Sequence, residues 1–134
     1  MVNNMADLYR KNIGKLGEKV AANYLKNHKY KILQLNYSTK VGEIDIICEN
    51  KEYIVFVEVK TRIKDSLVDG VYSVNKKKQY HIIRTASNYI SEYSCEKQPR
   101  FDIIEVEYDK SINKAYVTEH YKDAFAQGGD YAVF

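Results

Sequence analysis

The chain has 134 residues, of which 45% are hydrophobic and 29% are charged, and its formal net charge is +3. These values predict one globular domain spanning residues 1–134, with a core large enough to need no disulfide bonds. Apolar runs are too short to span a bilayer and no hydrophobic signal region begins the chain, so we expect a cytoplasmic protein that makes no membrane contact. Cys48 and Cys95 lack metal-binding spacing, and two reduced thiols are favoured over a disulfide.

The first expected element is a helix from about Asp7 to His28. Apolar residues recur near helical spacing in this segment, namely Leu8, Leu16, Val20 and Tyr24, with Ala21 and Leu25 widening the stripe. Gly14 and Gly17 interrupt it, and each glycine costs roughly 1 kcal/mol relative to alanine inside a helix. We therefore expect close packing of this helix against a neighbouring element to offset that cost.

Further elements follow from apolar periodicity, β-branched residues and turn residues. Strands are expected at Tyr30–Tyr37, Glu43–Glu49, Tyr53–Thr61, Phe101–Tyr108 and Ala115–Tyr121, and a second helix at Asn75–Tyr93. A polar loop is expected around Lys64–Tyr72, and a loosely held tail at about 122–134. The order of these elements predicts an α/β fold in which a central mixed β-sheet is flanked by helices.

The strand Tyr53–Thr61 carries the most informative pattern. Side chains of a strand alternate between faces, so one face begins with Ile54 and Phe56 and ends with Glu58 and Lys60. An acid and a base thus emerge side by side from an otherwise apolar face, an arrangement typical of active sites. The alternative is a plain salt bridge on an exposed face, which is the more frequent origin of such a pair.

Asp45 lies in the neighbouring apolar strand. A hairpin turning about residues 50 and 51 places Asp45 near Val57 or within one residue of it, and a register shift or bulge would bring it beside Glu58. Two adjoining carboxylates repel each other unless a cation such as Mg²⁺ neutralises them, and Glu18 of the first helix could add a ligand. Alternatively, Asp45 could accept a backbone amide at a strand end, and Glu18 could be a solvated helix residue.

Several motifs together resemble one protein family. The matching segments are Gly14-x-x-Gly17-Glu18-x-x-Ala21, Gly42 to Ile47, Val55 to Arg62, Lys76 to Lys78, and Arg100-Phe101-Asp102. These segments resemble the YraN-like (UPF0102) family of small proteins with a restriction-endonuclease-like core. The resemblance implies a metal-dependent nuclease site of the PD-(D/E)xK type, with Glu18, Asp45 and Glu58 in the acid positions and Lys60 in the lysine position.

The resulting hypothesis is an Mg²⁺- or Mn²⁺-dependent nuclease that hydrolyses DNA, with branched or single-stranded DNA as possible substrates. Asp45, Glu58 and Glu18 would be the metal ligands, and Lys60 would orient a water molecule or stabilise charge on phosphate. Phosphate contacts are expected from Arg62, Lys76, Lys77 and Lys78, although a solvated helix start is the alternative for the three lysines. A homodimer would double this basic surface. A non-enzymatic nucleic-acid-binding or adaptor protein that retains the nuclease fold is the alternative function.

Two further features are expected to have structural roles or surface positions and not to form part of the site. Arg100 and Asp102 flank Phe101 at the start of a core strand, and a pairing between them is favoured over a phosphate contact from Arg100. The three histidines, His28, His81 and His120, are scattered along the chain and are expected at the surface or its boundary.

Overall fold

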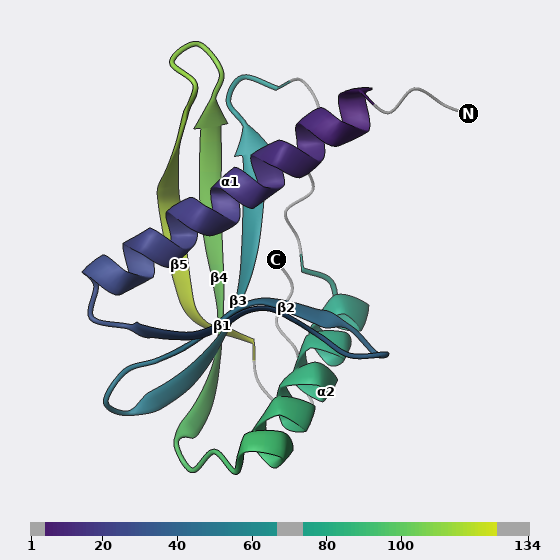
Figure 1. Cartoon of the computed structure of the whole chain (residues 1–134), viewed down its shortest axis with the longest axis vertical. Helices are drawn as coiled ribbons and strands as arrows, with labels where there is room; N and C mark the ends of the chain where they lie inside the picture. The colour runs from purple at the N-terminus through teal and green to yellow at the C-terminus, as the bar shows by residue number, and fades with distance from the viewer. Residues whose placement is uncertain (1–4, 67–73, 126–134) are drawn as a thin grey trace.

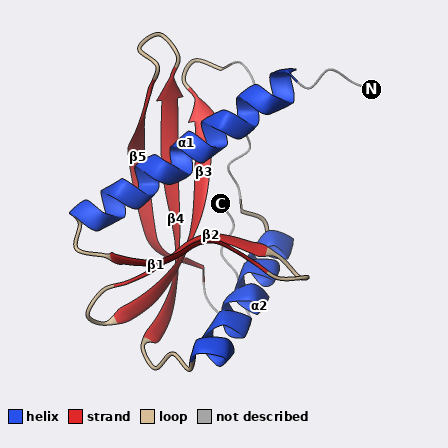
Figure 2. Ribbon diagram, in the orientation of Figure 1, coloured by secondary structure: helices blue, strands red, loops and turns tan. Residues whose placement is uncertain are grey.

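The structure of the protein, a computed structural model, describes residues 5–66 and 74–125. Two helices and five strands make up this part of the chain (Figures 1 and 2). The helices are α1 (Met5–Asn27) and α2 (Lys76–Tyr93), and the strands are β1 (Lys31–Ser38), β2 (Glu43–Glu49), β3 (Tyr53–Ile63), β4 (Gln98–Asp109) and β5 (Lys114–Phe125). Every helix and strand expected from the sequence is present, including the strand expected at Tyr30–Tyr37.

The five strands form one sheet in the order β1-β2-β3-β4-β5. Strands β3 and β4 are parallel, and the other neighbouring pairs are antiparallel. The parallel pair follows from the crossover through α2, because parallel strands cannot be joined by a tight turn. The predicted α/β fold with a central mixed sheet flanked by helices is therefore confirmed, and it is consistent with a restriction-endonuclease-like core.

Each helix covers a different face of the sheet. Helix α1 crosses in front of β3, β4 and β5, whereas α2 lies on the other side near β2 (Figure 1). On the α1 side, Ala21 and Leu25 pack with Val55 and Val57 of β3. On the α2 side, the core contains Ile54 and Phe56 of β3 together with residues of α2, β4 and β5. The alternation expected for β3 is thus observed.

The buried face of α1 differs from the apolar stripe expected from the sequence. Its buried residues are Ile13, Gly17, Ala21, Ala22 and Leu25, whereas Leu8 is 53% exposed. Gly17 explains the difference, because a Cβ atom there would collide with the side chain of Thr61 on β3. The helix therefore approaches the sheet along its small residues, as expected for Gly17, while a Cβ at Gly14 would meet nothing within 4 Å.

The C-terminal boundary also differs from expectation. Strand β5 continues to Phe125, and Ala124 and Phe125 are buried in the α2-side core. A loosely held tail beginning at about 122 is therefore wrong for residues 122–125, and its remainder, like residues 67–72 of the expected loop, lies outside the described residues. Both cysteines are free thiols, as favoured from the sequence. None of the helices in the described ranges is long and apolar enough to cross a membrane.

Candidate metal-dependent active site

Glu58 and Lys60 lie side by side on β3, as the alternation predicts. Glu58 is only 5% exposed, and the Lys60 Nζ atom lies 3.3 Å from its Oε2. A second ammonium group approaches the same oxygen from α2, because the Lys78 Nζ atom lies 3.4 Å from Oε2 of Glu58. One buried carboxylate is thus held between two lysines from different elements.

Asp45 reaches the same place from β2. In the observed hairpin Ile46 pairs with Val57, so the register is shifted relative to the expected pairing and Asp45 comes next to Glu58. Gly42 lies in the turn between β1 and β2, where Thr39 N–H donates to its carbonyl oxygen, and not in a bulge of β2. The Val59 N–H donates to Oδ2 of Asp45 at 2.8 Å. This bond fixes the carboxylate at the edge of the β2–β3 ladder.

Burial and the neighbouring carboxylate of Glu58 act together on Asp45. Burial raises the pKa of Asp45 from 3.8 to about 8, and the negative charge of Glu58 adds to this rise. The bond from the Val59 amide opposes the rise, and the charge of Glu18 adds a smaller contribution. At neutral pH the Asp45–Glu58 pair therefore retains a proton and carries less than its full negative charge. A divalent cation could replace that proton.

Glu18 stands near this pair but is held by another residue. The Asn36 side-chain amide donates to its Oε1 at 3.0 Å, and Asn36 itself has a positive φ of 51° on β1. Within residues 5–66 and 74–125, no three carboxylate, histidine or cysteine side chains are grouped closely enough to hold one ion together. Asp45 and Glu58 thus form the close pair, and Glu18 is set back from it.

The residues expected to contact nucleic acid are distributed over two places. Helix α2 begins with Lys76, Lys77 and Lys78, all exposed, and the side chain of Asn75 caps it by accepting the Lys78 N–H at 2.9 Å. Arg62 instead points to β4, where its guanidinium lies 3.2 Å from Oε2 of Glu107. Lys78 therefore lies at the Asp45–Glu58 site, whereas Arg62 forms a salt bridge with Glu107.

A groove of about 340 Å³ lies between α1 and β1 and begins at Glu18 and Asn36. Three lysines of α1, Lys15, Lys19 and Lys26, line this groove. Positions 15, 19 and 26 share one face of a helix. This spacing is visible in the sequence and could have indicated the row of lysines. Three positive charges of α1 therefore line the groove beside Glu18.

A buried polar cluster occupies the other half of the sheet, and the sequence indicated only part of it. The Arg100 guanidinium donates two hydrogen bonds to Asp102, at 2.9 and 2.7 Å, which confirms their expected pairing. The His120 Nε2 atom lies 2.7 Å from Oδ2 of Asp102. Its side chain is only 5% exposed, while the residue as a whole is half-buried, so the expected boundary position is confirmed. The spacing of Arg100 and Asp102 on one strand was the available signal, but nothing local indicated His120.

Comparison with known proteins agrees with the motifs. The family model described as "Uncharacterised protein family UPF0102" matches residues 17–106. A UPF0102 protein of Alkaliphilus oremlandii is 43% identical over 118 residues, covering 86% of this chain and 98% of the relative. One from Caldanaerobacter subterraneus subsp. tengcongensis is 46% identical over 103 residues, covering 76% and 84%. This chain belongs to the UPF0102 family.

Proposed function

We propose that the protein is a nuclease that uses a divalent metal ion to hydrolyse phosphodiester bonds in DNA, with branched and single-stranded DNA as the candidate substrates. The observation that carries the proposal is the close pairing of the buried Asp45 with Glu58, since burial and the charge of Glu58 together raise the pKa of Asp45. Two ionised carboxylates in contact repel each other, and a divalent cation bound between them would relieve that repulsion. Hard oxygen donors are the ligands that Mg²⁺ and Mn²⁺ prefer.

Asp45 and Glu58 would hold the metal ion directly, and Glu18 would reach it through water from its place beside Asn36. A bound divalent ion would polarise a phosphate oxygen and lower the pKa of a coordinated water molecule. The hydrogen bond from Val59 to Asp45 restricts the rotation of that carboxylate, which would preorganise the site. The donor set therefore fits a magnesium or manganese ion.

Lys60 and Lys78 would perform different tasks. Lys60 lies on the same strand face as Glu58, where its ammonium could orient the attacking water or stabilise charge on the phosphate. Lys78 comes from the exposed start of α2 and bonds Glu58 with a side chain that is 47% exposed, so it could leave Glu58 for a phosphate. Lys76 and Lys77 beside it, and the α1 groove lysines, would contact the nucleic-acid backbone.

The direct test is cleavage by the purified protein of a panel of duplex, single-stranded, flap and four-way-junction DNAs, with Mg²⁺, with Mn²⁺, and with a chelator. Wild type should cleave at least one member only when metal is present. Glu58→Gln should abolish cleavage, because it removes a charged metal ligand. Lys60→Ala should slow cleavage by about 10²–10⁴-fold, the usual range for a positioned proton-transfer group.

Matched controls are available on the same sheet. Glu49 on β2 pairs with Lys97 at 3.1 Å, so Glu49→Gln and Lys97→Ala make the same chemical changes outside the site and should leave cleavage unchanged. If both site variants cleave like wild type, the site assignment is wrong. If wild type binds DNA but cleaves no member of the panel, the protein is a non-enzymatic nucleic-acid-binding protein that retains the fold.

A further inference from the structure

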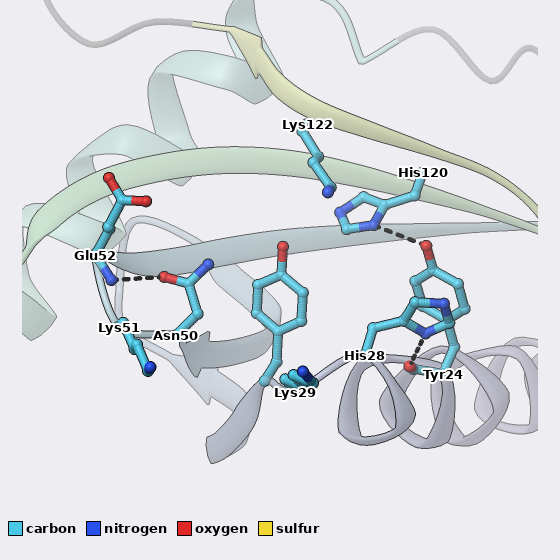
Figure 3. A pocket seen from close by; sticks show the side chains of 9 residues that line it. Tyr24, His28, Lys29, Asn50, Lys51, Glu52, His120 and Lys122 are labelled. Atoms are coloured by element: carbon cyan, nitrogen blue, oxygen red, sulfur yellow. Dashed lines mark hydrogen bonds between the residues drawn. The ribbon is translucent and has the colours of Figure 1, made fainter.

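A second pocket, of about 440 Å³, lies outside the acidic site (Figure 3). It is lined by the C-terminal end of α1, the turn between β2 and β3, and the C-terminal half of β5. Its volume falls within the range of small-molecule sites, which is roughly 300–1,000 Å³. Extended chain from Glu52, which lines this pocket, to Glu58 spans about 20 Å, at about 3.3 Å per residue. The pocket is therefore a separate place on the molecule.

His120 lines this pocket and connects it to the buried cluster of Arg100, Asp102 and His120. Burial alone would raise the pKa of Asp102, but hydrogen bonds from His120 and Arg100 lower it, so Asp102 is ionised and can only accept. His120 then donates to Asp102 from Nε2, and its Nδ1 atom is hydrogen-bonded to the Tyr24 hydroxyl at 3.1 Å. This chain of hydrogen bonds fixes the Tyr24 side chain before any ligand arrives.

The rim of the pocket is positively charged. Lys29, Lys51 and Lys122 line it, and Glu52 is the single acid among its lining residues. Lys122 extends its ammonium group into the space between His120 and Glu52 (Figure 3). Clustered lysines at a concave site attract anions, and phosphate groups bind well to such clusters. The charge of this pocket is thus opposite to that of the Asp45–Glu58 site.

Aromatic rings supply the remaining surface. The Tyr24 and His28 rings lie with centroids 4.1 Å apart and an interplanar angle of 32°, and both residues line the pocket beside Tyr30. His28 is also fixed, because its Nδ1 lies 2.7 Å from the Tyr24 carbonyl oxygen. Aromatic platforms held in place in this way are suited to stacking with a nucleobase.

We propose that this pocket binds a nucleotide, with the phosphate held by Lys29 and Lys122 and the base stacked on the Tyr24–His28 rings. A pocket of this volume, with anion-binding and aromatic surfaces side by side, fits a nucleotide better than a bare phosphate ion. The proposal goes beyond the nuclease site and does not depend on it, because none of these residues belongs to the acid pair or its lysines.

The test is calorimetric titration of the full-length protein, in the presence of a chelator, with thymidine monophosphate, thymidine and inorganic phosphate as three separate ligands. Thymidine monophosphate should bind at least about tenfold more tightly than either fragment, because only it engages both surfaces. The Lys29→Gln/Lys122→Gln double variant should bind it at least about tenfold more weakly. The matched Lys110→Gln/Lys114→Gln variant changes the same charge at the β4–β5 turn and should bind within about twofold of wild type.

Three results would overturn the proposal. Inorganic phosphate binding as tightly as the nucleotide would mean that the pocket is only an anion site. Equal weakening by the two double variants would mean that net charge, and not this pocket, determines binding. No detectable binding of thymidine monophosphate would remove the pocket as a nucleotide site, whether or not the protein cleaves DNA.

Discussion

Two aspartates on the same sheet have opposite surroundings. Asp102 on β4 is fully buried and accepts hydrogen bonds from Arg100, His120 and the Asp123 amide, so its pKa is lowered despite burial. Asp45 on β2 has one backbone donor and faces another carboxylate, so its pKa is raised to about 8. Burial acts in the same direction on both, and the neighbouring groups decide the outcome.

The difference separates an acid that is satisfied within the chain from the acid pair for which we propose a metal ligand. Both carboxylate oxygens of Asp102 accept hydrogen bonds from groups within the chain. A buried charge needs such partners for the folded state to be stable. Glu58, in contrast, is approached by Lys60 and the half-exposed Lys78, while Asp45 retains its proton. This contrast supports the proposal that the Asp45–Glu58 site holds a cation, and the following changes test the contrast.

Breaking the satisfied cluster should have the largest effect on stability. Asp102→Ala leaves the Arg100 charge buried without its partner, which costs about 3–5 kcal/mol in the free energy of unfolding. Glu107→Ala, the control, breaks the Arg62–Glu107 pair, whose arginine side chain is 43% exposed, and should cost at most about 1 kcal/mol. Urea denaturation compares the two. Equal losses would mean that the Asp102 cluster does not stabilise the fold in the way proposed.

Replacing Asp45 of the Asp45–Glu58 pair by a neutral residue should change how the free energy of unfolding depends on pH. Because the pKa of Asp45 rises from 3.8 to about 8 on folding, its protonation stabilises the folded state at low pH, and this contribution is lost as pH rises through about 8. Asp45→Asn stays neutral and keeps an acceptor for Val59. In metal-free urea denaturation, wild type should lose stability relative to this variant between pH 4 and 8, by at most about 1.4 kcal/mol per pH unit.

The result that contradicts this prediction is a difference between wild type and Asp45→Asn that stays constant over the same pH range. Glu49→Gln is the control for removing an acid from β2, because Glu49 pairs with Lys97 and not with another acid. Its stability should follow that of wild type as pH changes.

A smaller effect is expected where α1 is fixed beside the site. Gly17→Ala forces a Cβ atom against the Thr61 side chain, and overpacking of this kind costs about 1–3 kcal/mol. Gly14→Ala, in the same helix but with open space at its Cβ, should stabilise the protein by up to about 1 kcal/mol. Thermal unfolding of both variants checks the signs. Stabilisation by Gly17→Ala would mean that close packing with β3 does not set the position of Glu18.

Local patterns in the sequence predicted much of this structure. The period-two alternation of β3 separated Ile54 and Phe56 from Val55 and Val57, and the two groups do pack in different cores. The same pattern placed Glu58 beside Lys60, and the glycine at position 17 indicated the close approach of α1. These features depend on neighbours in the chain, so they can be read from it directly.

Features that depend on distant residues were not predictable in the same way. Hairpin register was misplaced because residues 50 to 52 permit more than one turn, and only the full sheet fixes Ile46 opposite Val57. Lys78 reaches Glu58 from another element, and His120 reaches Asp102 across β4 and β5. Likewise, the large apolar residues of α1 predicted the wrong buried face, because its small residues face the sheet.

We propose that Asp45 and Glu58 are kept together to hold a divalent metal ion. Calorimetric titration of Mn²⁺ into wild type, Asp45→Asn, Glu58→Gln and the control Glu49→Gln at pH 7, in two buffers of different ionisation enthalpy, tests it directly. We expect one ion to bind wild type and Glu49→Gln with release of a proton from the acid pair, and to bind each site variant at least about tenfold more weakly. Equal affinities in all four proteins, or no binding to wild type, would contradict the claim.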